Sequence, residues 1–291
     1  MDHDIFYYID FFYYSVAYMA MAFLLFLVGK FVYGILHKKI NVKHQLVEED
    51  NFAFAIAHTG YFIGLLLAIG AAIQGDSYGL LIDLQEIAIW GLFSIILLNL
   101  SVIINDKIIL RKFSVYKEII EDKNEGTGVI EAASMISSGL IIFGAVSGEA
   151  HDLVSGITQA TVFWLIGQFG ILLVSIVYQW STPYDIHEHI EKDNVAVGLG
   201  FAGAIIAIGN LIRYGIEGEF ISWADSLIFV GFDLFLGLMF LPVIRYLTDK
   251  ILLPGQDITD ELINQEKPNV GAGLIEAFAY IGGSILITWC L

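Results

Sequence analysis

Cysteine and basic residues are scarce in this chain of 291 residues. Cys290 is the only cysteine, so neither an internal disulfide nor a cluster of thiolate metal ligands can form. Lys and Arg number 14 against 31 Asp and Glu, and they form no stripe, which excludes a nucleic-acid-binding surface. Charged residues make up only 15% of the chain, too few to cover the surface of a soluble domain.

Apolar residues are abundant instead, at 57% of the chain with a mean hydropathy of +0.73. Segments with the alternating pattern of membrane β-strands are absent. The apolar residues fall into eight runs, most of them near or above the ~20 residues that span a bilayer as a helix: 9–36, 51–73, 81–104, 126–147, 153–180, 194–215, 222–247 and 270–290. We therefore predict an all-α integral membrane protein, a polytopic helical bundle of eight transmembrane helices in a lipid bilayer.

The basic residues predict the orientation of these spans. Twelve of the 14 flank the connections from odd to even runs, which places that side in the cytoplasm and both termini outside. The other two are Lys30, inside the first run, and Arg213, near the opposite face. The start "MDHDIFYYIDFF" lacks the positive region of a cleavable signal peptide, so we expect the first run to remain as a span.

Internal repeats divide the chain. A shift of 143 residues aligns "HQLVEEDNFA" with "HEHIEKDNVA" and "NDKIIL" with "TDKILL", and a two-residue insertion then aligns "GTGVIEA" with "GAGLIEA". We predict two four-span units in tandem, at 1–147 and 148–291. Each even run opens with Asn followed by small residues two and four positions later, so a two-span unit occurs four times, always inserted the same way: Asn51, Asn124, Asn194 and Asn269. We expect the Asn to cap a helix and the small residues to allow close packing.

These units, with openings such as "NFAFAIAHTG" and "NEGTGVIEAA", resemble the YjfL-like bacterial inner-membrane proteins, the domain of unknown function 350 family. The resemblance covers 45–147 and 188–290 most clearly. It implies a multi-pass protein of the bacterial cytoplasmic membrane. Its relatives look like single four-span units, which suggests that they dimerise, and a homo-oligomer of this chain is also expected. The family carries no established activity, so the resemblance implies no functional residues and leaves any cofactor unknown.

Ionisable residues recur seven positions after the repeat Asn, at His58, Glu131 and Glu276, with Phe201 in the third unit. Each lies ~10 Å below the start of its helix. Lys30 is expected at a similar depth, so the four polar groups form one predicted layer in the inner third of the membrane. A buried carboxylate must be paired, protonated or hydrated. Three interpretations stay open: Lys30 neutralises Glu131 or Glu276 and the cluster fixes packing, the layer is a proton or cation site, or Lys30 reaches the cytoplasmic interface.

A second polar set comprises Glu86, Asn99 and Asp233, on the third and seventh runs. Asp233 is expected near the midplane, about twelve residues from the outer end of its run. If these side chains face one interior, they and the inner layer make a discontinuous polar route across the membrane.

Weaker patterns lie in the connections. His44 with Glu48 and His187 with Glu191 have the spacing of one helix face, which is typical of a metal site or of a solvated linker. The segment 108–122 carries Ile109, Phe113, Tyr116 and Ile120 on one face and predicts a helix in the cytoplasmic interface.

These patterns favour two alternative functions. The first is a transporter or channel for protons or cations, in which Glu131→Gln or Glu276→Gln abolishes flux. The alternative is a scaffold or envelope-stress partner that organises lipid or recruits a cytoplasmic protein through 108–122. No phosphate-binding loop, nucleophile elbow, zinc motif or haem-type pair is present, so we expect no enzyme activity.

Overall fold

The computed structural model describes residues 5–108, 114–148, 150, 152–218, 220–253 and 255–291. Over these residues it contains eight long helices and no strand. All eight are long and apolar enough to cross a membrane, so the predicted all-α bundle of eight spans is confirmed. Their bounds fall within a few residues of the predicted runs: α1 Ile5–Leu36, α2 Phe52–Ile73, α3 Leu80–Ile108, α4 Glu125–Val146, α5 Leu153–Ser181, α7 Val195–Ile216, α8 Trp223–Leu247 and α9 Val270–Cys290.

Short helical turns lead into the four helices that begin with the repeat Asn. They span His44–Glu48, Lys117–Glu121, Ile186–Glu191 (α6) and Asp260–Asn264, while a further turn at Thr248–Leu252 extends α8. Asp50, Lys123 and Asp193, each directly before a repeat Asn, have positive φ values of 47°, 53° and 58°. This left-handed residue ends the turn and lets the chain reverse into the following helix.

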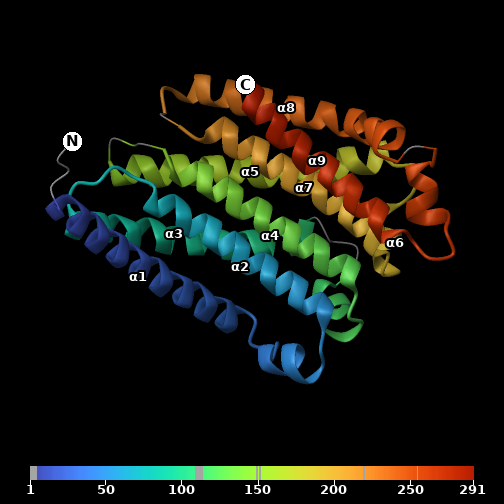
Figure 1. Cartoon of the computed structure of the whole chain (residues 1–291), viewed down its shortest axis with the longest axis horizontal. Coiled ribbons are helices and arrows are strands. Elements are labelled where there is room, and N and C mark those ends of the chain that lie inside the picture. Colours follow the sequence, from blue (N-terminus) through green and yellow to red (C-terminus); the bar gives the residue numbers. More distant parts are fainter. Residues whose placement is uncertain (1–4, 109–113, 149, 151, 219, 254) are drawn as a thin grey trace.

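The four repeat helices α2, α4, α7 and α9 lie side by side in one row, in chain order, and each packs on the next (Figure 1). The other four helices form a second layer. In that layer α3 packs on both α2 and α4, α5 on both α4 and α7, and α8 on both α7 and α9, while α1 packs on α2 and α3. We call the end of the bundle where the repeat helices begin the Asn end. The row has two ends, α2 and α9, so the four units do not enclose a common interior.

The small residues of the repeat explain how closely the row packs. The residue four positions after Asn in one helix meets the residue two positions after Asn in the preceding helix. A Cβ atom on Gly128, Gly198 or Gly273 would lie 2.5, 2.9 or 2.4 Å from the carbonyl oxygen of Ala53, Gly126 or Ala196, respectively. Only glycine fits there, because the two backbones are in direct contact.

Each repeat Asn also connects neighbouring units. Its side-chain oxygen accepts a hydrogen bond from the backbone N–H three residues later, at 2.8–3.2 Å, and so caps the helix. The amide nitrogens of Asn51, Asn124 and Asn194 donate to the backbone carbonyls of Ile119, Ile190 and Leu262, in or next to the turn that leads into the next repeat helix. Asn269 differs, because it is exposed and its amide nitrogen donates to the Glu261 carboxylate. One side chain therefore caps a helix and joins it to the next unit.

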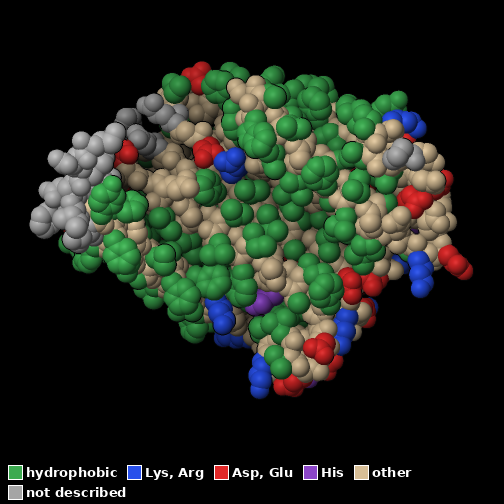
Figure 2. Space-filling model, viewed as in Figure 1, with side chains coloured by type: hydrophobic (Ala, Val, Ile, Leu, Met, Phe, Trp, Pro, Cys, Tyr) green, Lys and Arg blue, Asp and Glu red, His purple; other side chains and the backbone are tan. Residues whose placement is uncertain are grey.

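The surface agrees with a membrane environment. Figure 2 shows a broad hydrophobic face, with charged side chains gathered towards the Asn end. Large apolar side chains on the outside of α1, α8 and α9 are exposed, among them Phe12, Phe31, Phe235 and Trp289 at 61–79%. Exposing so much apolar surface is unfavourable in water and favourable in lipid. The chain is an integral membrane protein.

Candidate functional site

A small cavity near the Asn end of the first half contains two carboxyl groups. It measures about 80 Å³ and is lined by α1, α2, α3, α4 and the turn that leads into α4. Glu131 of α4 and Asp106 of α3 are its acidic residues, and the rest of the lining is largely aromatic and aliphatic. We call it the Glu131 cavity. Its volume is sufficient for a few water molecules at ~30 Å³ each.

Glu131 has no counter-charge among the described residues. Its side chain is 8% exposed, and its Oε2 atom, like Oδ1 of Asp106, has no hydrogen-bond partner. His37, which also lines the cavity, lies just beyond α1, and burial lowers its pKa, so the ring is neutral near pH 7. Since the charge of Asp106 acts on Glu131, ionising both is unfavourable, and the pair is suited to hold a proton or to bind a cation.

The equivalent Glu276 of the second half is neutralised. It is fully buried, and its Oε1 atom accepts a hydrogen bond from the Arg245 guanidinium at 2.5 Å. The hydroxyls of Tyr178 and Tyr280 donate to the same oxygen, each at 3.4 Å. The guanidinium also lies 5.7 Å from the centre of the Tyr184 ring and donates to Thr259. This buried ion pair has the geometry of a structural contact.

The sequence analysis missed Arg245 as a partner for Glu276 and counted it only among the basic residues that flank the connections. The 143-residue shift that aligns the two halves places Arg245 opposite Val102, which lines the Glu131 cavity. An arginine in one copy of a repeat where the other copy has valine is a signal that the sequence does contain. The two halves therefore differ at the position that decides whether the buried carboxyl is paired.

The remaining members of the predicted layer form no hydrogen bond or ion pair with either carboxyl among the described residues. The His58 ring packs among Tyr33, Phe54 and Phe62, with ring centres 4.4–5.1 Å away, and its Nδ1 has no partner. Phe201 stacks on Tyr178 in the same way. Lys30 is exposed, and among the described residues it pairs with neither Glu131 nor Glu276. Instead of one shared layer, the structure has a separate environment in each half.

The second polar set also separates. Asn99 is buried and bonds to Ile95 and to the hydroxyl of Tyr61, a residue of the Glu131 cavity. Glu86 and Asp233 line two larger cavities at the opposite end, of about 490 and 450 Å³. We call these the Glu86 cavity and the Asp233 cavity. Neither shares a lining residue with the Glu131 cavity, so the Glu131 cavity does not open into either of them.

A polar stripe on α4 partly connects the two ends, and it was not predicted. Ser134 and Ser138 follow Glu131 by three and seven residues, so the three side chains lie on one helix face. Both serines are at most 1% exposed. Asn105 and Gln168 donate to the Ser138 hydroxyl at 3.4 and 3.3 Å, whereas the Ser134 hydroxyl has no partner. The stripe extends ~10 Å along the helix from Glu131.

The connections hold no metal centre among the described residues, where no group of three or more potential ligands occurs. His44 pairs with Glu48 at 2.8 Å on the surface, and His187 lies 3.8 Å from Asp185 rather than pairing with Glu191. Within the segment 108–122, Ile109 and Phe113 lie outside the described residues. Of the rest, Tyr116 is exposed and Ile120 is partly buried against α2.

Comparison with known proteins gave one match. The model of the family described as Domain of Unknown Function (DUF350) matches the chain twice, at residues 7–146 and 152–291. Neither the curated proteins nor the solved structures gave a match.

Proposed function

The chain belongs to the DUF350 family, of which it carries two copies in tandem, and on this premise we propose that it conducts protons or monovalent cations through the Glu131 cavity. The family description assigns no activity, so the proposal rests on the residues of this chain. We propose transport without chemical transformation of the transported species.

The observation that carries the proposal is the unpaired, buried Glu131. An ionisable group at membrane depth is unfavourable unless it is neutralised, and proteins retain such groups mainly along ion and proton pathways. Glu276, in the matching position, has Arg245 beside it and needs no mobile ion. Glu131 has only another acid, Asp106, in its cavity. A proton or a cation is the simplest partner for this pair.

The proposed path continues along α4. A proton or ion leaving Glu131 meets the hydroxyls of Ser134 and Ser138, which are buried and point along one face. The buried Ile142 then follows, and Ala145, three residues further, lines the Asp233 cavity at the opposite end. Ile142 is therefore the proposed gate, because an apolar side chain at this point blocks water and ions until the packing opens.

The test is flux through the purified protein in liposomes, measured separately for H⁺, Na⁺ and K⁺ gradients. Glu131→Gln keeps the side-chain shape and removes the ionisable group, so flux is expected to fall to the level of empty liposomes. Glu125→Gln, on the first turn of the same helix and outside the cavity, is the matched control and keeps the flux. Thermal unfolding of both variants checks that they are folded. Full flux in folded Glu131→Gln, or no flux of any of the three ions through the wild type, contradicts the proposal.

We further propose that the Asn end faces the cytoplasm and that the membrane is the bacterial inner membrane. The support is the distribution of basic residues, 12 of 14 of which flank connections at that end. Cys290, the only cysteine, lies at the opposite end and is exposed. A membrane-impermeant maleimide added to intact spheroplasts is expected to label it, with Cys290→Ser as the blank. Labelling only after the membrane is permeabilised indicates the reverse orientation.

A further inference from the structure

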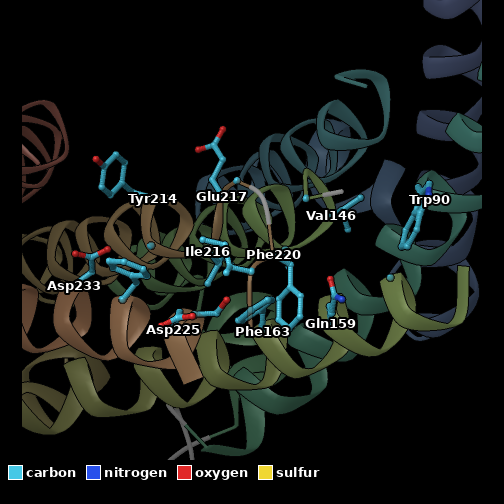
Figure 3. A pocket seen from close by; sticks show the side chains of 18 residues that line it. Trp90, Val146, Gln159, Phe163, Tyr214, Ile216, Glu217, Phe220, Asp225 and Asp233 are labelled. Carbon is cyan, nitrogen blue, oxygen red and sulfur yellow. The ribbon is translucent and has the colours of Figure 1, made fainter. Parts of the chain in front are cut away.

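The Asp233 cavity is an aromatic chamber at the end opposite to the Asn end. It lies between α5, α7 and α8, beside the end of α4, and measures about 450 Å³, within the usual range for small-molecule sites. Phe163, Tyr214, Phe220 and Phe229 contribute rings, and Trp90 closes the side towards α3. Figure 3 shows Phe163 and Phe220 in the middle of the lining, with Asp233 towards one end and Trp90 towards the other.

The repeat builds this cavity twice, and the copy at Asp233 has more aromatic residues. The Glu86 cavity lies between the same parts one unit earlier, over the ends of α2 and α4, and the two cavities share Trp90, Val146 and Gly148. Besides Trp90, Tyr78 is its only aromatic lining residue, and its three acids are all exposed: Asp76, Glu86 and Asp152. The larger aromatic lining and the buried acid of the Asp233 cavity are therefore not a necessary product of the repeat.

The Asp233 carboxylate has no partner of its own. The side chain is only 6% exposed, yet no described residue donates a hydrogen bond to it or forms an ion pair with it. It lies against Gly215, where a Cβ atom would come within 2.5 Å of Oδ2. The other acids of the lining are occupied, because Glu217 pairs with Arg213 and Asp225 accepts from Ser222. One buried carboxyl group without a partner thus faces whatever enters the cavity.

We propose that the Asp233 cavity binds an organic ammonium ion. The cationic head group would lie at Asp233, and its alkyl substituents would pack on the aromatic rings. The faces of aromatic rings attract such cations, and a desolvated carboxylate adds charge recognition. A bare metal ion fits poorly, since calcium and magnesium need six or more oxygen ligands and the described residues offer no such group. The cavity is also far larger than one ion.

Access is from the end where Cys290 lies. Glu217, Gly218 and Ile221 line the cavity and are exposed, so its mouth lies at the surface. Binding here goes beyond the proposed conduction and does not depend on Glu131, which lies in the other cavity.

Choline and its uncharged carbon isostere, 3,3-dimethylbutan-1-ol, are suitable probes for isothermal titration of the whole protein in nanodiscs. Saturable binding is expected for choline and not for the alcohol. Asp233→Asn should weaken choline binding at least about tenfold, because a buried charge loses its partner. Asp233→Glu, which keeps the charge, should recover part of the affinity. The control Glu86→Gln removes an exposed acid from the neighbouring Glu86 cavity and none from the Asp233 cavity, so its choline affinity should stay within about twofold of the wild type.

Four outcomes overturn the proposal: equal affinity for choline and the alcohol, unchanged affinity in folded Asp233→Asn, Asp233-dependent binding of Mg²⁺ or K⁺ without binding of choline, or no choline binding to the folded wild type. Glu131→Gln is expected to bind choline like the wild type. Loss of flux with intact choline binding in that variant therefore separates the two sites.

Discussion

The two halves of the molecule carry the same glutamate, seven residues after a repeat Asn, in different surroundings. Glu276 is closed in by Arg245 and two tyrosine hydroxyls. Glu131 faces a small cavity that contains a second acid and no described cation partner. The halves have the same helices and the same close glycine contacts, so the difference comes from a few side chains. A duplicated unit can thus keep one copy of a charged residue for stability while the other copy is free to titrate.

The energetic roles of the two glutamates follow from this comparison. A buried ion pair is a weak net source of stability, but breaking it leaves an uncompensated charge in a medium of low polarity. Glu276 and Arg245 therefore depend on each other. Glu131 can change its protonation state without leaving a buried cation behind, which is what a conducting site requires.

The largest expected effect comes from removing Arg245, the residue that makes the second half differ from the first. Arg245→Ala leaves Glu276 buried and unpaired, and we expect it to lower the free energy of unfolding by about 3–5 kcal/mol. Chemical unfolding in detergent measures this loss. Lys192→Ala, which removes the exposed pair with Glu188, is the control and should cause no measurable loss. If the two variants lose the same stability, the Arg245–Glu276 pair is not a structural contact.

Adding an arginine to the first half tests the comparison from the other side. Val102→Arg places a guanidinium where the second half has Arg245, and we expect it to pair with Glu131 and to reduce ion flux at least about tenfold, or ~1.4 kcal/mol. Val102→Leu, which fills the same position without charge, should keep the flux.

Full flux in folded Val102→Arg would show that the carboxyl is not the conducting group. If the variant is unstable, a double-mutant cycle with Glu131→Gln decides. A pair between the two side chains predicts that Glu131→Gln destabilises the Val102→Arg background and has a smaller effect in the wild type.

The fold could be read from the sequence because it depends on patterns that are local or repeated. Long apolar runs give the eight spans, and the recurrence of Asn with two small residues gives the four units and the family. The same motif correctly predicted close packing of backbones, since Gly128 and its equivalents meet backbone directly. None of these conclusions depends on which side chains face one another across the bundle.

Predicting the candidate site does require knowing which side chains face one another, and the sequence does not give this directly. Spacing along the helix put His58 at the same depth as Glu131, but the rotation of α2 turns the ring into an aromatic cluster. Lys30 appeared to be the available cation, whereas the nearest cation to Glu276 comes from the last turn of α8. The Asp233 cavity depends on residues from five helices and two connections, far apart in the chain.

At the two ends of the row of repeat helices, bulky side chains stand where the contacts inside the row have small residues. Where two repeat helices meet, the residues nine and fifteen positions after the repeat Asn are small. Gly60 and Gly203 are examples of the first position, and Gly139 and Gly209 are examples of the second. The outward-facing copies of these positions are Phe278 on α9 and Leu66 on α2, which are 64% and 58% exposed. Bulky side chains prevent another backbone from approaching as closely as in the row, much as the end repeats of a solenoid stop it from growing. We therefore expect that copies of this chain do not extend the row through the same close helix contact.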